Sequence, residues 1–212
     1  MKILNLYAGI GGNRKHWDGD KHNITAVEIN QEIAEEYRKN FPKDNVVVGD
    51  AHEYLKNNYR DFDFIWCSPP CPTHSRIRKA GVGNGQYDAK YPDMKLWQEI
   101  LFLDQYFRGD YVVENVKPFY DEKVNWEMLV PQESGQHYLW SNYAIPDTEI
   151  ASMNHNNGNC SKWQQWLGIQ VKDSWRTVEK RKVLRNCVHP KIGEKILKAR
   201  NTKQTKLKVG SQ

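Results

Sequence analysis

Residues 2–12, KILNLYAGIGG, decide how this chain folds, because an apolar segment runs directly into a turn that contains three glycines. The segment from Lys2 to Ala8 predicts a buried β-strand, since its apolar run is short and ends at a turn signal. Glycines at a strand-to-helix turn let the backbone come close to a bound ligand. The stretch therefore predicts the first strand of a ligand-binding α/β domain.

Strand-like and helix-like segments alternate from this stretch as far as residue 116. The further strands expected are 24–29, 45–49, 62–67 and 111–116, and the helices are 31–41, 51–59 and 93–107. Residues 75–91, rich in glycine and basic residues, are expected to form a loop. Residues 117–182 follow a less regular pattern, with short strand-like pieces and an Asn/Gly-rich loop at 154–159, and 191–200 predicts a last helix. We therefore expect an α/β fold with a doubly wound, mostly parallel sheet, whose ligands bind beyond the carboxyl ends of the strands.

Two acidic residues stand at the ends of the second and third expected strands. Glu28 lies 19 residues after Gly9, where a carboxylate can accept hydrogen bonds from ribose hydroxyls. Asp50 is suited to accept from an adenine amino group. The spacing Gly-x-Gly-Gly differs from the pattern that cradles a pyrophosphate, which leaves room for an amino-acid-bearing nucleoside such as S-adenosylmethionine. A purely structural glycine turn is the alternative.

A cysteine follows the fourth expected strand, and a glutamate lies near the end of the fifth. Cys71 is framed by Pro70 and Pro72, and Glu114 precedes Asn115. A lone cysteine is usually a small buried apolar residue, but here it lies at the mouth of a nucleoside pocket beside an acid. A thiolate that adds to C6 of cytosine makes C5 nucleophilic, and an acid at N3 stabilises the charge that develops. This pair therefore predicts covalent catalysis on a cytosine base. In a duplex the base is stacked, so it has to be flipped out before the thiolate can reach C6.

Composition and charge restrict the class of protein. The chain has 212 residues with a net charge of +5, but 12 basic and 2 acidic residues lie from Arg176 onward, against 19 basic and 24 acidic before it. The basic end suggests a polyanionic partner. No apolar run approaches the roughly 18 residues of a membrane helix, and no signal peptide is recognisable. We expect a cytoplasmic monomer without membrane contact and without a metal, since His155, Cys160, Cys187 and His189 match no common zinc spacing.

The motifs resemble, in order, those of the DNA cytosine-5 methyltransferases. The resemblance covers residues 1–118 and 184–200, and the compact C-terminal half is similar to the short bacteriophage forms. A role in restriction-modification belongs to the same expectation, and the sequence names no restriction partner. The resemblance implies a Rossmann-like fold, S-adenosylmethionine as cofactor and double-stranded DNA as substrate. It also implies Cys71 as nucleophile, Glu114 as the contact to N3, and Asn115 as a brace of the cysteine loop. The cofactor residues that it implies are Tyr7, Ala8, Gly9, Gly11, Gly12, Glu28, Ile29, Asp50, Ala51, Pro70, Asn186 and Val188.

The resemblance is less complete in the parts that contact nucleic acid. It implies that Arg76, Arg78 and Lys79 clamp phosphates from a loop that moves. Where the family has Gln-x-Arg-x-Arg, this chain has Gln136-His137-Tyr138, so Gln136 and His137 are the candidates for contacting the cytosine carbonyl. We expect a catalytic domain at 1–118 and 184–200, a small target-recognition region at 119–183 and a basic flexible tail at 201–212. Residues 154–166 are the expected groove contacts, and their tryptophans are alternatively core residues.

Three alternative functions remain open from the sequence. One branch of the family methylates cytosine C5 in tRNA, and the short recognition region suits that substrate as well. Ser68-Pro69-Pro70 resembles the start of an amino-methyltransferase signature, although Cys71 stands where that site needs an aromatic ring. A catalytically weak DNA-binding protein on the same fold is the third alternative, which the missing arginines favour and Cys71 disfavours.

Overall fold

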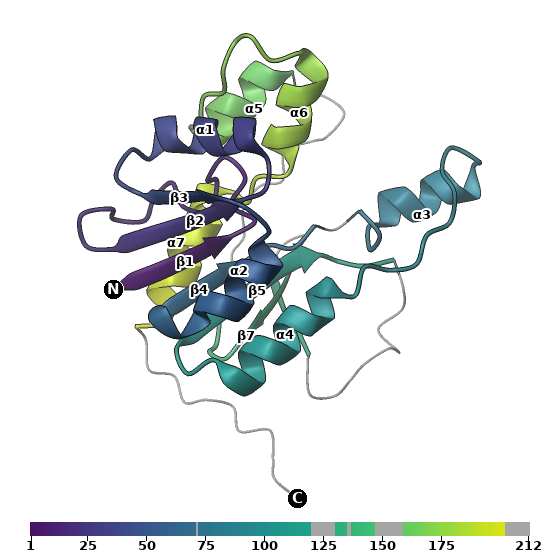
Figure 1. Cartoon of the computed structure of the whole chain (residues 1–212). Helices are drawn as coiled ribbons and strands as arrows, with labels where there is room; N and C mark the ends of the chain where they lie inside the picture. Colours follow the sequence, from purple (N-terminus) through teal and green to yellow (C-terminus); the bar gives the residue numbers. More distant parts are fainter. Residues whose placement is uncertain (71, 120–129, 135–136, 147–158, 202–212) are drawn as a thin grey trace, which may run out of the picture.

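The computed structural model describes residues 1–70, 72–119, 130–134, 137–146 and 159–201. One sheet runs through this part of the chain, in the strand order β3-β2-β1-β4-β5-β7-β6 (Figure 1). Its strands are β1 Lys2–Leu6, β2 Asn23–Glu28, β3 Asn45–Val48, β4 Phe64–Cys67, β5 Asp110–Val116, β6 Gln132–Ser134 and β7 His137–Ser141. The first five are parallel, and β7 and β6 are added in antiparallel pairs. The expected mostly parallel α/β sheet is therefore confirmed.

Helices cover both faces of the sheet. The helices of the described residues are α1 Gln31–Asn40, α2 Ala51–Asn58, α3 Arg76–Gly83, α4 Lys95–Tyr106, α5 Cys160–Leu167, α6 Thr177–Arg185 and α7 Pro190–Ala199, with a short 3-10 turn at Tyr59–Asp61; α3 does not lie on the sheet. Alternate residues of each strand face opposite layers. Leu4 and Leu6 pack with α2 and α4, whereas Ile3 packs with α7. This two-sided burial is the doubly wound Rossmann-like arrangement that the alternating segments predicted.

A separate apolar cluster fastens the α5–α6 pair to the rest of the molecule. Trp163, Leu167, Trp175 and Leu184 pack around Ile10 of the glycine turn, and the pair lies beside α1 in Figure 1. The indole of Trp175 also donates to Glu32 of α1 at 3.0 Å. This cluster brings the C-terminal part of the chain to the turn after β1.

The prediction of a loop at residues 75–91 was wrong for residues 76–83, which form α3, whereas residues 84–91 lie outside any helix or strand. The Ser75 side chain caps the helix by accepting from the backbone N–H of Arg78 at 3.3 Å. Gly81, which favoured a loop, is needed inside the helix, since a Cβ there would lie 2.2 Å from the ring of Tyr87. Figure 1 shows α3 projecting from the body of the molecule beyond the strand ends.

The short strand-like pieces expected within residues 117–182 are present, but the helices in this range were not predicted. The segment contains β6, β7, α5 and the start of α6. Asn159 caps α5 by accepting from the backbone of Lys162 at 2.9 Å, and Gly168 ends it in the left-handed region. Because β7 pairs with β5, part of the expected recognition region belongs to the catalytic sheet.

Several segments for which a role was expected lie partly outside the described residues. Of the expected groove contacts, residues 154–158 lie outside the described part, and Trp163, 3% exposed, is a core residue rather than a groove contact. The expected tail at 201–212 also lies outside it beyond Asn201. In the described ranges, no helix combines the length and apolar character needed to cross a membrane.

Candidate active site

The sheet order changes direction between β1 and β4, and the candidate site lies at the carboxyl ends of these strands. The chain passes from β1 outward to β2 and β3, then returns to place β4 on the other side of β1. Such a switch point leaves a crevice at the strand ends, because the following helices leave on opposite faces. The turn after Leu6 and the segment after Cys67 therefore start side by side, and the backbone N–H of Ser68 donates to Leu6 at 3.4 Å.

The first glycine of the turn is the one that faces open space. Gly9 has φ +55°, and nothing lies within 4 Å of the position a Cβ would take. Its N–H donates to Oε2 of Glu28 at 3.0 Å, and Oε1 of the same carboxylate accepts from Asn30 at 2.9 Å. Tyr7, two residues earlier, also has a positive φ of 55°, a conformation that costs an L-residue free energy. The turn is thus held by Glu28 and leaves its backbone open to a ligand.

The other two glycines are required by packing rather than by an open surface. A Cβ on Gly11 would lie 2.2 Å from the ring of Phe41, the residue directly after α1. A Cβ on Gly12 would lie 2.4 Å from the carbonyl oxygen of Val188. The close approach at Gly12 brings the C-terminal segment after α6 against the glycine turn.

The ends of β2 and β3 supply an apolar surface and a second acid. Ile29, directly after Glu28, is 68% exposed, which suits a residue that packs on a planar base. Asp50 caps α2 by accepting from the backbone of His52 at 2.8 Å, and its other oxygen lies 3.4 Å from Nζ of Lys95. Burial raises the pKa of Asp50, but these hydrogen bonds and Lys95 outweigh it and lower the pKa below its ordinary value. Asp50 is therefore a carboxylate at neutral pH.

The predicted cofactor residues differ in what they can present to a ligand. The side chains of Ala8, Ala51 and Val188 are buried in the core, so only their backbone can face a ligand. Pro70 and Asn186 are exposed. Asn186 ends α6, directly before the segment that contacts Gly12.

The segment that leads to the predicted nucleophile is tied to the end of β5. Asn115 is 2% exposed, and its side-chain amide donates to the carbonyl oxygen of Pro69 at 3.0 Å. This is the contact expected of a brace for the cysteine loop. Cys71 itself lies outside the described residues.

The predicted acid has a histidine as its partner. Glu114, 6% exposed, projects from β5, and its Oε1 lies 2.5 Å from Nδ1 of His137 on β7. Burial lowers the pKa of His137, but attraction and hydrogen bonding to Glu114 outweigh it, so the net shift is upward. The pair can therefore share a proton at the end of β5. Gln136, the other candidate in this segment, lies outside the described residues.

The three basic residues predicted to bind phosphate stand on α3, in different settings. The guanidinium of Arg78 lies 5.6 Å from the ring centroid of Tyr87 and donates to the carbonyl of Asp88 at 2.9 Å. Arg76 is exposed, with its Nε 3.4 Å from the carbonyl of Pro118, and Lys79 is exposed above the ring of Phe119. Arg78 thus folds the segment after α3 back onto the helix, while Arg76 and Lys79 present charge to solvent.

Three residues next to the pocket escaped the sequence reasoning. Glu99 of α4 accepts a hydrogen bond from the hydroxyl of Tyr7 and lies 3.0 Å from Nδ1 of His52, and Lys95 contacts Asp50. One signal was present, because Glu99 falls on the apolar stripe formed by Leu96, Ile100 and Leu103 of the expected helix. An acid in such a stripe indicates a buried carboxylate with a specific partner.

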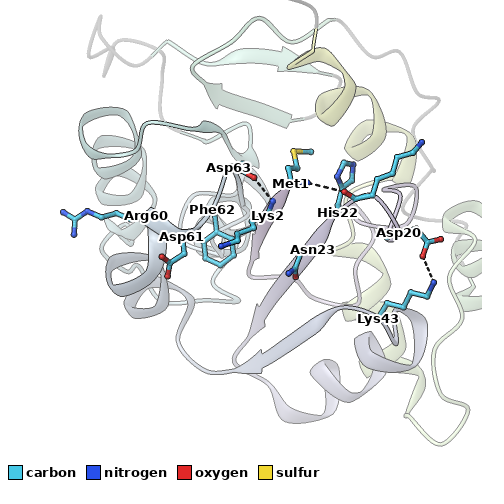
Figure 2. A pocket seen from close by; sticks show the side chains of 12 residues that line it. Met1, Lys2, Asp20, His22, Asn23, Lys43, Arg60, Asp61, Phe62 and Asp63 are labelled. Atoms are coloured by element: carbon cyan, nitrogen blue, oxygen red, sulfur yellow. Dashed lines mark hydrogen bonds and ion pairs between the residues drawn. The ribbon is translucent and has the colours of Figure 1, made fainter.

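A separate hollow lies at the opposite edge of the sheet. Figure 2 shows this open hollow, of about 840 Å³, at the amino ends of β1, β2 and β4. Part of its polar lining is internally paired, with Lys43 bonded to Asp20 at 2.5 Å and the backbone of Lys2 bonded to Asp63 at 2.7 Å, whereas the buried Nδ1 of His22 has no hydrogen-bond partner among the described residues. None of the predicted site residues lines it, so it is distinct from the candidate active site.

The carboxyl-edge site fits a nucleoside cofactor that carries no phosphate. The open face of Gly9, the Glu28 carboxylate and the exposed Ile29 match the turn, ribose and base contacts expected of S-adenosylmethionine. Among the residues that the structure describes, no three His, Cys, Asp or Glu side chains form a group able to hold a metal ion.

Comparisons with known proteins agree with this geometry. A family model for C-5 cytosine-specific DNA methylases matches residues 1–133. The tRNA (cytosine(38)-C(5))-methyltransferase of Spodoptera frugiperda is 34% identical over 131 residues, which are 58% of this chain and 37% of that protein. The chain therefore spans well under half of that relative's length.

Solved structures are also similar in part. One is a mutant of Spodoptera frugiperda DNMT2, with 24% identity, a TM-score of 0.43, and coverage of 71% of this chain and 53% of that one. Another is a SAM-dependent methyltransferase of Agrobacterium tumefaciens, with 13% identity, a TM-score of 0.42, and coverage of 58% and 41%. Because the family model matches more than half of the 212 residues, the chain belongs to the C-5 cytosine-specific DNA methylases, a family of S-adenosylmethionine-dependent enzymes.

Proposed function

We propose that this protein transfers a methyl group from S-adenosylmethionine to C5 of cytosine in double-stranded DNA, through a covalent bond between Cys71 and C6 of the base. The observation that carries the proposal is the hydrogen bond from Asn115 to the carbonyl of Pro69. It ties the segment before the nucleophile to the strand end that holds Glu114. We infer from this link that the thiol of Cys71 and the carboxyl of Glu114 act on the same cytosine ring.

The reaction needs two groups of this chain that act on opposite sides of the ring. The thiolate of Cys71 forms a bond to C6, and the electrons of the C5–C6 double bond become available at C5. A proton held by Glu114 and His137 hydrogen-bonds to N3 and stabilises the negative charge that develops on the ring. Once C5 carries the methyl group, removal of the C5 proton by a base would let the C5–H electrons re-form the C5–C6 double bond, while the C6–S bond breaks and its electrons return to sulfur as the thiolate.

The cofactor site would hold the methyl donor beside C5. Gly9, Glu28, Ile29 and Asp50 would hold S-adenosylmethionine, which when bound provides an electrophilic methyl group to C5. Glu28 keeps two further acceptor positions for ribose hydroxyls, since each of its oxygens accepts one backbone bond. Ile29 offers an exposed apolar surface for the adenine.

The nucleic acid would meet the arm formed by α3. Arg76 and Lys79 present positive charge to phosphates, and Arg78 holds the arm in shape through Tyr87. The arm leaves the sheet directly after the segment that contains Cys71, so contacts along it would bring a flipped cytosine to the nucleophile.

The experiment is base-resolution sequencing of DNA from a methylation-free bacterium that expresses the chain. We expect 5-methylcytosine in a short target, and none with the Cys71→Ala variant. Folded wild-type protein that leaves no 5-methylcytosine in DNA or RNA would contradict the proposal. An N-methylated base in place of 5-methylcytosine would assign the chain to amino-methyl transfer instead.

A tRNA substrate is the second candidate, because the Spodoptera frugiperda relative acts on tRNA and is 34% identical over the matched region. Purified protein should be given labelled S-adenosylmethionine with equal amounts of duplex DNA or tRNA. Label in DNA supports the first candidate. Label in tRNA alone, lost in Cys71→Ala, would replace it with the second.

A further inference from the structure

A carboxylate is buried in the apolar face of α4. Glu99 is 1% exposed, and the surrounding residues Leu96, Ile100 and Leu103 are core residues. Burying a carboxylate carries a large free-energy cost unless hydrogen bonds or a charge compensate it. An apolar side chain would serve the core better at this position. A buried acid that costs stability in the core indicates a role in a nearby functional site.

Three donors from three separate elements converge on this carboxylate. The hydroxyl of Tyr7 donates to Oε1, the ring of His52 lies 3.0 Å from the same oxygen, and the thiol of Cys67 donates to Oε2 at 2.9 Å. Burial raises the pKa of both Tyr7 and Cys67, and the nearby negative groups raise it further. The hydroxyl and the thiol therefore stay protonated and act as donors. No Lys or Arg in the described residues forms an ion pair with Glu99, so within that part of the chain its carboxyl oxygens are held by these three side chains.

Each donor belongs to an element that borders the nucleoside site. Tyr7 stands between β1 and Gly9 in a left-handed conformation. His52 lies in the first turn of α2, and its N–H bonds to Asp50. One turn before Glu99 on the same helix, Lys95 contacts the free oxygen of Asp50. The first two turns of α4 thus connect to both strand ends that hold the predicted turn and base contacts.

We propose that Glu99 is a positioning residue for S-adenosylmethionine, which holds Tyr7 and His52 in the orientation that the cofactor site requires. The inference rests on the proposed function for the identity of the cofactor. An unfavourable backbone conformation persists only where its surroundings determine it, and the bond from the Tyr7 hydroxyl to Glu99 anchors the far end of that side chain. Loss of the anchor lets Tyr7 relax and moves the backbone that leads to Gly9.

The test is a double-mutant cycle on cofactor binding. The dissociation constants of S-adenosylmethionine and S-adenosylhomocysteine are measured by calorimetry for wild type, Tyr7→Phe, Glu99→Gln and the double variant. We expect each single change to weaken binding roughly tenfold, the size expected for losing one hydrogen bond to a charged group. The double variant should bind about as weakly as the weaker single variant, because both changes act on the same Tyr7–Glu99 hydrogen bond, which the amide of Glu99→Gln can accept only through its one oxygen.

The matched control is Glu36→Gln. Glu36 is also a buried acid, 5% exposed, but it stands on α1 and pairs with Lys39. It should leave the dissociation constants within about twofold of wild type. A purely structural role for Glu99 predicts a lower melting temperature with unchanged cofactor binding. That outcome, or additive effects of the two changes, would overturn the inference.

Two further outcomes have defined meanings. If Glu99→Gln does not fold, Tyr7→Phe and His52→Ala decide the question, since both keep the carboxylate. Unchanged binding in both variants would overturn the inference. Folded wild-type protein that binds neither ligand would instead contradict the proposed function, so the two failures are distinguishable.

Discussion

Replacing Gly12 with alanine tests whether the C-terminal segment closes on the glycine turn. The new Cβ would lie 2.4 Å from the carbonyl oxygen of Val188 and 2.9 Å from Cβ of Cys187. An ordinary C···O contact is about 3.3 Å or longer, so one of the two backbones has to move by about 0.9 Å. The main obstacle is a backbone oxygen that no side-chain rotation removes.

The size of the effect follows from the cost of overpacking. Forcing one extra carbon into a packed region costs about 1–3 kcal/mol. For a chain of this size that loss lowers the melting temperature by about 2–12 °C. Because the displaced turn is the one that faces the cofactor, the further rise in melting temperature on adding S-adenosylmethionine should also be smaller than in wild type.

Thermal unfolding measured by calorimetry, with and without S-adenosylmethionine, checks both expectations. Gly83→Ala is the control, since nothing lies within 4 Å of the Cβ position at Gly83 and its φ is not positive. Alanine favours the helix there, so no loss of stability is expected. A Gly12→Ala protein that melts within a degree of wild type would show that the segments are not packed as described.

Three other predictions concern the same edge of the sheet. Asn115→Ala should lower kcat while leaving the S-adenosylmethionine dissociation constant unchanged, as single-turnover kinetics and calorimetry would show; weaker cofactor binding with normal kcat would refute its role as a brace. Cys67 and Cys187 should resist alkylation in the native protein, because burial raises the pKa of both thiols, that of Cys187 to about 12; rapid labelling of either, read by mass spectrometry, would contradict this. The ion pair of His137 with Glu114 raises the folded-state pKa of the histidine, so its stabilisation is fully present below the ordinary histidine pKa and is lost as pH rises through the raised value. The stability difference between wild type and His137→Gln, from urea unfolding, should therefore shrink with rising pH, and a constant difference would refute it.

Local sequence patterns were sufficient for the parallel part of the sheet. The segment at Lys2–Leu6 and the four strands after it are apolar runs bounded by turn residues, and each formed within a few residues of its predicted limits. The same patterns predicted that Gly9, Glu28 and Asp50 share one edge, because carboxyl ends of parallel strands meet there. Strand burial and turn formation depend on residues that are close together along the chain, so both can be predicted from a single sequence.

Helices with mixed signals were not predictable in this way. At α3, the glycines favoured a loop, but the Ser75 side chain caps a helix there and Gly81 leaves room for the ring of Tyr87. At α5, the cap at Asn159 was visible in the sequence, but the surrounding Asn/Gly-rich stretch obscured it. In both segments, tertiary contacts outweighed local propensity.

The sequence by itself determined the chemistry-bearing residue types and the order in which the strands deliver them to one edge. Only the tertiary structure decided which partners they have. It set His137 against Glu114, packed Val188 on Gly12, and brought Tyr7 and Cys67 to Glu99. These residues are far apart along the chain, and their contacts depend on sheet register and helix packing. Spacing in the sequence does not encode such contacts directly, because they form only when the sheet and its helices assemble.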